Sequence, residues 1–562
     1  MRAPGLFIRP AIVLRLLAAA LLAIHVLRLW TREQICASVA WNMCQYLVGD
    51  TLPLAIVVGC LLLLSIVQPR PRLIGLPPFA TIALLCLMTV VIGLSGRTII
   101  FGDFDFSRDE VLAVQDGEII AGGKLMAQLP SQWEEDRGAL QPFFIVRLPD
   151  KRLILSAYLP VHSALRALVS KIADPAWLNP LLSAVSVWLL YMIGRRLWPT
   201  RPDAALLSAV LLASSPQFLI TSMTSYAMSA HLALNLLWLW LFLRDRPLAH
   251  LAAMIVGFAA CGLHQLIFHP LFVAPFLLSL WQAKRWRLLG AYVLAYGAMG
   301  LFWINYWLLL ALLTQTQMPQ GAPLGAGLLV QRLAEFIDLF EPGFVPLMGQ
   351  NLVRFVVWQS PLVVGLFWLA LRRQRSLHEE AMVGGIVLTI LIVFVVTAEQ
   401  GLGWGYRYLH GCLGSLCLLA GAYAARLPQG RWVGLASALV GFCVLLPLHL
   451  RAAADLVTPY REAVAAIEQQ KVDVVLVDTD SLRHGVDLVR NRPQVTNHPV
   501  VLALAALPME RLAQICAAHS TLYLGRDFGA LHGIEPSPGE ERERARIRRQ
   551  WLEQASCGHR KG

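Results

Sequence analysis

The chain has 562 residues, of which 57% are hydrophobic and only 15% are charged. Ordinary soluble enzymes have a charged fraction of roughly 25%. The low charged fraction of this chain and its mean hydropathy of +0.60 therefore exclude it from that class. The formal net charge of +12 comes mainly from arginines in short clusters between apolar runs, a pattern that orients membrane proteins and argues against nucleic acid as a partner. The composition predicts a polytopic α-helical membrane protein.

Residues 1–96 are predicted to form the N-terminal transmembrane helices. A basic start precedes the apolar run Ala11–Trp30. A signal peptide begins in the same way, but Arg15 interrupts this run and further spans follow, so we expect an uncleaved first helix. The next two spans are predicted at Leu52–Val67 and Pro77–Ser95.

Residues 97–175 are predicted to form an external catalytic loop with interfacial helices. The loop opens with the first long polar segment of the chain, Phe101–Leu129. Four carboxylates stand close together near its start: Asp103, Asp105, Asp109 and Glu110. At the mouth of a membrane helix they form either a solvated hinge or an acid/base or metal site at the membrane surface. Further along, the apolar spacing of Ser156–Ile172 predicts a helix in the membrane interface.

Residues 176–450 are predicted to form the transmembrane helical core, which brings the total to about thirteen spans. Two predicted spans are short for a straight crossing, and they form either paired crossings or a re-entrant pair: Leu251–Leu263 and Pro270–Gln282. The others are Trp177–Gly194, Asp203–Ile220, Tyr226–Leu243, Leu288–Leu310, Val353–Leu371, Ala381–Ala398, Leu409–Ala425 and Trp432–Leu450. A polar segment, Thr314–Asn351, interrupts the series.

The positive-inside rule sorts the loops between these spans. The arginine-rich loops alternate along the chain and fall on one side together with the N-terminus, which places that side in the cytoplasm. The opposite side receives the carboxylate segment, the residues after Arg451 and the polar residues that are chemically most useful: Asp109, Glu110, Tyr226, His264, His269, Tyr406 and Arg407. We therefore expect one shared site at the external surface.

Residues 451–562 are predicted to form a small external α/β domain with a charged tail. Helical and strand patterns alternate in YREAVAAIEQQ, VDVVLVDTDS, PVVLALAAL, MERLAQICAAH and STLYLGRD, which favours a layered domain. This region has no glycine-rich phosphate loop. We interpret the acidic end of VDVVLVDTDS as part of a capping domain rather than as a nucleotide site.

Four cysteines fall outside the predicted spans. Cys36 and Cys44 share the first external loop, and Cys516 and Cys557 share the external domain. If the external compartment is oxidising, both pairs are candidates for disulfides. The cysteines within the spans are interpreted as small apolar residues.

Several segments between Arg97 and Ala425 carry a resemblance to a known family. They are the acidic pair Asp109–Glu110, the helix GEIIAGGKL, a proline-centred interfacial segment, an RRL turn, LLASSPQFL, SYAMSAHL at Ser225–Leu232 and GWGYRYL at Gly403–Leu409. Together they resemble the membrane glycosyltransferases of the GT-C fold, and most of all the bacterial relatives of the dolichyl-phosphate-mannose protein mannosyltransferases, the aminoarabinose transferase and the Rgt-type sugar transferases. Leu112 and LPVHS depart from the family pattern, which often has an aromatic residue and then Lys and Pro-Gly there.

The resemblance implies a hexosyl or pentosyl transferase in a bacterial inner membrane. Such an enzyme takes a sugar from a polyprenyl-phosphate carrier on the external face and passes it to a hydroxyl of a glycan, lipid or protein, usually with inversion. By the family motif Asp109 is the catalytic base, and Glu110 is the neighbour that positions the acceptor or tunes the pair. From the residues alone, SRDEV also allows a structural role for Asp109 as a helix N-cap.

The remaining candidate residues are expected to bind substrate, and each has a structural alternative. Arg407, with Tyr406 beside it, is expected to bind the carrier phosphate. The alternative is an arginine that snorkels to the interface. His264 and His269 bracket a bend and either bind phosphate or a metal or are interfacial residues. Tyr226 lies in the outer turn of its predicted helix.

Asp105 forms a D-x-D pair with Asp103, a pattern that cytosolic sugar transferases use for a metal-bound nucleotide diphosphate. No such nucleotide is expected on the external face, so we interpret the match as accidental and retain Asp105 only as a substrate-binding candidate. We predict no metal site and no certain cofactor, while a divalent cation on these carboxylates stays open.

The alternative function belongs to another class: a flippase or transporter of lipid-linked glycan, or a non-enzymatic assembly subunit. Transporters place ionisable groups near the bilayer midplane and often contain internal repeats. In this sequence no repeat is evident, and the candidate charges gather at one face. The sequence therefore favours the enzyme.

Overall fold

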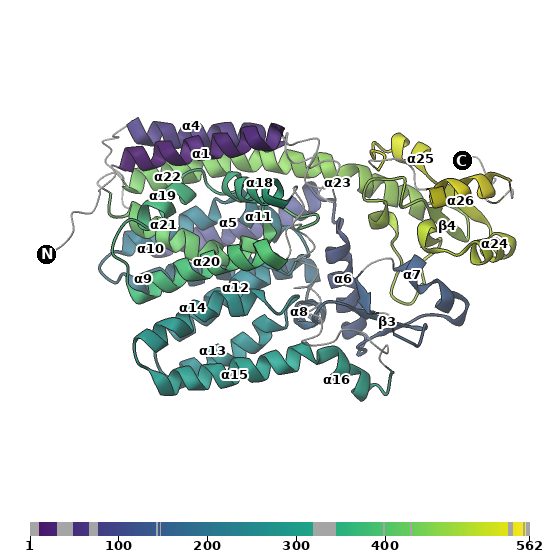
Figure 1. The fold of residues 1–562 in the computed structure, drawn as a ribbon, viewed down its shortest axis with the longest axis horizontal. Coiled ribbons are helices and arrows are strands. Elements are labelled where there is room, and N and C mark those ends of the chain that lie inside the picture. Colours follow the sequence, from purple (N-terminus) through teal and green to yellow (C-terminus); the bar gives the residue numbers. More distant parts are fainter. Residues whose placement is uncertain are drawn as a thin grey trace. The chain divides into compact units, whose positions relative to one another are not determined.

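The computed structural model describes residues 10–30, 49–66, 77–141, 144–146, 148–317, 344–396, 400–427, 430–537, 543–554 and 557. These residues are mostly helical (Figure 1). The chain divides into two compact units. Unit 1 comprises residues 1–96, 176–304 and 325–452, and unit 2 comprises residues 97–175, 305–324 and 453–562.

Unit 1 is built from apolar helices, because a helix satisfies its own backbone hydrogen bonds where water is absent. In chain order they are α1 (Pro10–Trp30), α4 (Thr51–Ile66), α5 (Pro78–Ile99), α9 (Leu178–Leu197), α10 (Pro202–Ala213), α11 (Pro216–Ser222), α12 (Met228–Phe242), α13 (Pro247–Cys261), α14 (Phe268–Gln282), α15 (Trp286–Ile304), α18 (Phe344–Val357), α19 (Val363–Ala370), α20 (Leu377–Val396), α21 (Leu413–Ala424) and α22 (Gly430–Val440). A 3-10 helix, Arg407–Cys412, precedes α21, and a π-helical turn, Gly441–Leu445, leads into α23 (Leu446–Glu468).

The predicted fold class, a polytopic α-helical membrane protein with a small α/β domain, is confirmed. Among the described residues, six helices are long and apolar enough to cross a membrane, or up to seven if the bent pair α10–α11 counts as one span. Four other predicted spans correspond to shorter apolar helices of 10–17 residues: α4, α12, α13 and α14. Length and composition therefore do not confirm the predicted count of about thirteen.

The predicted span Asp203–Ile220 contains a break. Helix α10 ends at Ala213, and α11 begins at Pro216 at an angle of 60°. Proline lacks the backbone N–H that would continue the first helix. Ser215 caps the second helix, because its Oγ accepts a hydrogen bond from the backbone N of Phe218 at 3.3 Å.

Small residues let neighbouring helices of unit 1 approach closely. A Cβ added at Gly421 of α21 would lie 2.6 Å from the backbone N of Ser208 in α10. At Gly194 of α9 an added Cβ would lie 2.8 Å from the Cα of Ala205, also in α10. Close packing of this kind holds helices together in lipid, where no hydrophobic force acts between them. Helix α10 therefore packs against both α9 and α21.

The first part of unit 2 combines short helices with a small antiparallel sheet. It contains α6 (Arg108–Ala121), β1 (Ala127–Gln128), the 3-10 helix Ser131–Asp136, α7 (Arg137–Leu140), β2 (Ile145–Val146), β3 (Leu153–Ser156), α8 (Val161–Val169) and α16 (Tyr306–Leu313). The strand order is β1-β3-β2, with Ala127 opposite Ile154 and Ile145 opposite Ser156. Helix α6 packs against α8, which lies within the predicted interfacial segment.

The C-terminal part of unit 2 is the predicted α/β domain. Strands β4 (Val474–Val477), β5 (Val500–Ala503) and β6 (Thr521–Leu524) form a parallel sheet in the order β5-β4-β6. Strands β4 and β5 are buried along their whole length, which explains their uninterrupted apolar sequences. The predicted helix MERLAQICAAH is α24 (Met509–Ala518), and α25 (Arg526–Leu531) and α26 (Glu543–Gln554) follow.

One hydrophobic core joins the two parts of unit 2. Residues before and within α7 pack with the C-terminal sheet and α24 in a single buried cluster, which includes Leu129, Trp133, Leu140, Val474, Leu476, Leu502 and Leu512. The carboxylate segment that begins unit 2 therefore folds together with the last part of the chain.

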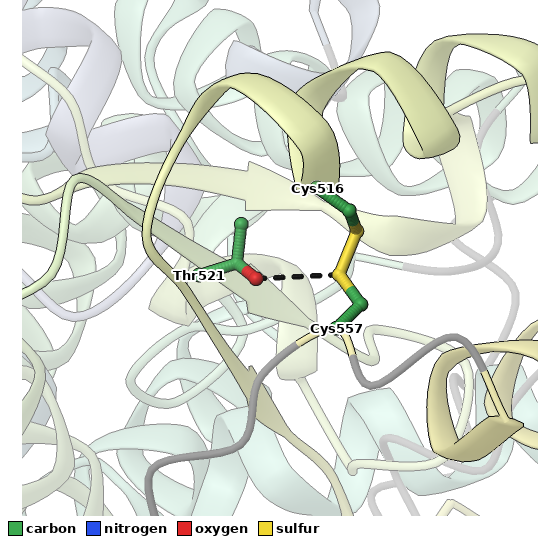
Figure 2. Close-up of a disulfide and its surroundings, with 3 residues drawn as sticks. All are labelled: Cys516, Thr521 and Cys557. Atoms are coloured by element: carbon green, nitrogen blue, oxygen red, sulfur yellow. Dashed lines mark hydrogen bonds between the residues drawn. A yellow bond between two sulfur atoms is a disulfide. The ribbon is translucent and has the colours of Figure 1, made fainter.

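A disulfide joins α24 to the C-terminal tail. Figure 2 shows Cys516 bonded to Cys557, with the hydroxyl of Thr521 3.2 Å from the sulfur of Cys557. The Cα atoms of the two cysteines lie 5.5 Å apart, a spacing that suits a disulfide. This predicted pair is confirmed, whereas Cys36 and Cys44 lie outside the described residues.

Replacing both cysteines, Cys516→Ser with Cys557→Ser, is expected to lower the free energy of unfolding of unit 2 by about 3–4 kcal/mol, because the bond constrains the unfolded chain. Thermal unfolding of the full chain in lipid nanodiscs measures the loss. The variant Cys443→Ser, which removes an exposed free cysteine, is the control. If the double variant unfolds at the same temperature as the parent, the disulfide does not contribute to stability.

Candidate active site

Reciprocal hydrogen bonds fix the start of α6. The Oγ of Ser107 accepts from the backbone N of Glu110 at 3.3 Å, and the Glu110 carboxylate accepts from the backbone N of Ser107 at 3.2 Å. This arrangement is a capping box. The N-cap that the sequence allows at Asp109 is therefore at Ser107. Asp109 lies inside the first turn of the helix, and capping does not account for it.

Asp109 is buried and hydrogen-bonded to a tyrosine. The residue is 8% exposed, and its Oδ1 accepts a hydrogen bond from the hydroxyl of Tyr158. The ring of Tyr158 stacks on that of Phe144 at a centroid distance of 5.3 Å, and its backbone N donates to the Oγ of Ser156 at 3.1 Å. These contacts give the Asp109 carboxylate a defined orientation.

The neighbouring carboxylate of Asp105 pairs with Arg97. The Nη1 and Nη2 atoms of Arg97 donate to the two oxygens of Asp105 at 3.2 and 3.4 Å, and its Nε lies 3.6 Å from Asp103. One arginine thus contacts both carboxylates of the D-x-D pair and compensates one of their two charges. In the part of the chain that the structure describes, no three His, Cys, Asp or Glu side chains form a group that could hold a metal ion.

Buried charges connect the start of α6 to the segment after β4. Arg108 donates to the backbone oxygen of Val489 at 2.7 Å, and Arg490 donates to that of Phe106 at 2.9 Å. Burial raises the pKa of Asp487 to about 6, although Arg108 and Arg490 act to lower it. Burial lowers the pKa of the Arg490 guanidinium to about 10. The two arginines and Asp487 form one ionic cluster within unit 2.

Asp116 is a second carboxyl group on α6 with an altered environment. It follows Asp109 by two helical turns and lines a small cavity with Gln141 and Ser156. Burial raises the pKa of Asp116 to about 7, and a hydrogen bond with Ser156 partly opposes this rise. The pKa of nearby Tyr306 is raised to about 12, first by burial and then by the charge of Asp116.

In unit 1, Arg407 lies between two tyrosines. Its guanidinium carbon is 5.4 Å from the ring centroids of both Tyr226 and Tyr408, a distance at which cation–π attraction operates. A Cβ added at Gly403 would lie 2.9 Å from the Cδ of Arg407, so glycine makes room for the arginine side chain. The lining of a small cavity beside it mixes apolar residues such as Met228 and Phe268 with four polar ones: Arg407, His231, Asn235 and Thr389.

An arginine from α18 holds the segment that carries Arg407. The Nε of Arg354 donates to the backbone oxygen of Gly405 at 3.0 Å, and its Nη2 donates to that of Gly403 at 3.3 Å. Gly405 has a φ of 66°, which favours glycine. Gln400 also donates to the Gly405 oxygen, at 2.9 Å. The backbone around Gly405 is therefore fixed by side chains.

The buried carboxylate of Asp50 is the ionic partner of two arginines in unit 1. The Nη1 of Arg354 lies 3.4 Å from each oxygen of Asp50, and a guanidinium nitrogen of Arg28 lies 3.9 Å from Asp50. The indole N–H of Trp358 donates to Asp50 at 3.2 Å. All three charged residues are buried. Charges in such a place need a partner, since desolvation is costly.

The other candidates in unit 1 have defined partners. Tyr406 is fully buried, and its hydroxyl contacts the sulfur of Met348 at 3.7 Å. The ring nitrogens of His269 lie 2.7 Å from the Oδ1 of Asn235 and 2.8 Å from the hydroxyl of Tyr296. Both residues have the environment of a protein interior. The Tyr226 hydroxyl donates to the backbone oxygen of Leu402 at 3.0 Å, and His264 lies between α13 and α14, half-buried.

The predicted site residues divide between the two units. Unit 2 contains Asp105, Asp109 and Glu110, and unit 1 contains Tyr226, His264, His269, Tyr406 and Arg407. Sequence reasoning missed five residues that shape these surroundings: Asp50, Asp116, Tyr158, Arg354 and Arg490. Charge within or next to an apolar run is the signal that could have found Asp50 and Arg354.

Comparison with solved structures found similar chains, among them two structures of one protein. No family model and no curated protein matches the chain. The chain is similar to a crystal structure of ArnT from Cupriavidus metallidurans bound to undecaprenyl phosphate, with 12% identity and a TM-score of 0.48 over 74% of this chain and 85% of that one. The crystal structure of ArnT in the apo state has 12% identity and a TM-score of 0.47 over 81% of this chain and 95% of that one. At this level of similarity, the comparison assigns no substrate and no catalytic residue to this chain.

Asp50→Asn is expected to lower the free energy of unfolding by about 3–5 kcal/mol, because it leaves buried arginines without a carboxylate. Thermal unfolding in nanodiscs measures the change. Asp203→Asn is the matched control, since Asp203 pairs with the exposed Arg431 at 3.6 Å. Equal losses in the two variants would show that the buried cluster has no special contribution.

Asp116 is expected to make unit 2 less stable as the pH rises. Between about pH 4 and pH 7 the unfolded chain has lost this proton while the folded chain keeps it, so stability falls through this range and levels off above it. In Asp116→Asn this part of the fall is expected to disappear. Unfolding midpoints between pH 5 and pH 8 test it, with Asp150→Asn as control because arginine contacts lower the pKa of Asp150. A slope unchanged in Asp116→Asn would contradict the assignment.

Proposed function

We propose that this chain is a membrane glycosyltransferase that moves a sugar from a polyprenyl-phosphate carrier to a hydroxyl acceptor. The observation that carries the proposal is the state of Asp109. It is a buried carboxylate at the start of α6 that does not act as the helix cap and that Tyr158 orients through a hydrogen bond. The sequence motifs around Asp109 support the same activity.

In the proposed reaction Asp109 takes the proton of the acceptor hydroxyl. The acceptor oxygen attacks the anomeric carbon from the side opposite the carrier phosphate. A new C–O bond forms, the bond from the anomeric carbon to the phosphate oxygen breaks, and the phosphate leaves with that electron pair. A single displacement of this kind inverts the anomeric configuration.

Two residues beside Asp109 are proposed as positioning residues. Tyr158 donates to Oδ1 and so limits the directions in which the carboxylate can receive a proton. Glu110 has the contacts of a capping residue, and its hydrogen bonds with Ser107 decide where α6 begins. Its proposed role in catalysis is therefore to hold Asp109 in place.

For the carrier phosphate we propose Arg407. A guanidinium presents paired N–H donors to phosphate oxygens and keeps its charge at any physiological pH. The rings of Tyr226 and Tyr408 flank this guanidinium and limit the conformations that it can adopt. Tyr406 and His269 are proposed to support this region from the interior, whereas His264 and Asp105 are proposed to contact substrate.

The proposed location is the external face of a bacterial inner membrane. The arginine-rich loops place the N-terminus in the cytoplasm by the positive-inside rule, and this orientation puts unit 2 on the other side. A lipid-borne donor suits that compartment. The acceptor is a glycan, a lipid or a protein.

Asp109→Asn is expected to lower the rate of sugar transfer roughly 100-fold to 10,000-fold, because an amide does not accept the acceptor proton. Transfer is measured in membrane vesicles from a radiolabelled polyprenyl-phosphate-sugar pool at matched expression, together with retention of the donor lipid. The control is Asp103→Asn, a nearby carboxylate whose side chain is 61% exposed. Undiminished transfer by Asp109→Asn would exclude it as the base, and movement of donor lipid across the bilayer without transfer would favour the flippase.

A further inference from the structure

An open pocket of about 580 Å³ lies in unit 2. Its volume is within the range of small-molecule sites, roughly 300–1,000 Å³. Its walls come from α6, from the segment Arg490–His498 and from Glu468 at the end of α23, and Asp105 also lines it. None of the residues proposed for proton transfer occupies this space.

One face of α6 forms the first wall. Val111, Val114, Gln115 and Glu118 line the pocket, and their i, i+3, i+4, i+7 spacing places them on one side of a helix. The same helix carries Asp109 in its first turn. Asp109 lies on another side of this helix, where it contacts Tyr158, so the pocket and the proposed base use different faces of α6.

Hydrogen bonds hold the opposite wall in place. The Nε2 of Gln115 donates to the backbone oxygen of Asn491 at 2.6 Å. The Asn491 side chain both donates to the backbone oxygen of Val501 and accepts from its backbone N, at 2.7 and 2.9 Å. The backbone N of Arg492 donates to Asn497 at 2.8 Å. Such a wall is ordered without a ligand, which lowers the entropic cost of binding.

Three charged side chains of this pocket keep their hydrogen-bonding capacity. Within the described parts of the chain, the side chains of Glu118, Glu468 and Arg492 form no hydrogen bond. Carboxylates offer paired acceptors, and a guanidinium offers paired donors. Adjacent hydroxyl groups on a sugar ring match both kinds of pair.

The rest of the lining also suits a sugar. Apolar side chains provide a surface for the C–H groups of a sugar ring, and they are Val111, Val114 and Pro493. The acidic residues Asp105, Glu118 and Glu468 are nearly balanced by Arg490 and Arg492, so the pocket has no strong field of one sign. A neutral ligand rich in hydroxyl groups fits this lining better than a charged peptide does.

We propose that this pocket binds the acceptor and that the acceptor is the sugar of a glycan. The assignment of the ligand as acceptor rests on the proposed function, whereas sugar binding in the pocket is tested without it. Glu118, Arg492 and Glu468 hold the hydroxyl groups of the sugar.

Saturation-transfer NMR on the full chain in nanodiscs tests the binding. The probes are methyl glucoside, methyl galactoside, methyl mannoside and lactose, with a serine-containing octapeptide as the competing class. The variants Glu118→Gln and Arg492→Gln remove two of the charges proposed to bind the hydroxyl groups of the sugar, and Val114→Trp fills the pocket. Glu134→Gln, which lies outside the pocket lining, is the matched control, and thermal unfolding shows that each variant is folded.

We expect at least one sugar to show saturation transfer with the parent and with Glu134→Gln, and the signal to fall about tenfold in the three pocket variants. The octapeptide is expected to leave it unchanged. Absence of signal for every sugar, equal signals in pocket variants and control, or displacement by the octapeptide would each overturn the proposal. Asp109→Asn keeps the pocket, so sugar binding with no transfer by any form of the protein would reject the proposed function and leave the sugar site standing.

Discussion

The capping box between Ser107 and Glu110 is the interaction on which the proposed site in unit 2 depends. It decides at which residue α6 begins and therefore how each side chain is rotated about the helix axis. With the helix starting at Arg108, Asp109 meets Tyr158, and Asp116 reaches the cavity beside Ser156. A start one residue later would turn every side chain by roughly 100°. The hydrogen bonds between Ser107 and Glu110 thus help to determine the directions in which Asp109 and Asp116 point from α6.

Unit 1 meets a different constraint, which is charge in an apolar interior. The carboxylate of Asp50 is the ionic partner of both Arg354 and Arg28. The remaining N–H groups of Arg354 donate two hydrogen bonds to the backbone oxygens of Gly403 and Gly405. A glycine segment has little of its own to hold it in one conformation. The buried ion cluster supplies the missing restraint and so supports the position of Arg407. Glycine has no side chain that could pack against neighbours, so the hydrogen bonds from Arg354 take the place of apolar packing around Gly405.

Local patterns in the sequence were sufficient for the parts of the fold that depend on near neighbours. The apolar runs predicted β4 and β5, and the spacing of MERLAQICAAH predicted α24. The predicted span Asp203–Ile220 runs through Pro216, although a proline favours a break there. The S-x-x-E pattern at Ser107 predicts the capping box, whereas the structural alternative weighed for SRDEV placed the cap at Asp109. These errors come from choosing between competing local signals.

Other parts of the site were beyond any local pattern. Tyr158 meets Asp109 across a sequence separation of 49 residues, and Arg490 reaches Phe106 across 384. Such partners follow from the tertiary fold, because neither residue type nor spacing marks them. The same applies to Asp116, whose pKa is raised by burial in a cavity that residues of β1, α7 and β3 line.

The pairing of Arg108 and Phe106 with the segment around Arg490 also has a consequence for biosynthesis. When the ribosome has made α6, the residues that receive its hydrogen bonds are still hundreds of codons away. The strand β4 that leads into them is central in its sheet and needs β6, which is translated later still. Contacts so distant in sequence form slowly and late. A nascent chain, or one truncated before β6, would carry the acidic pair of α6 without the surroundings that orient it, so the proposed activity can begin only after translation is complete.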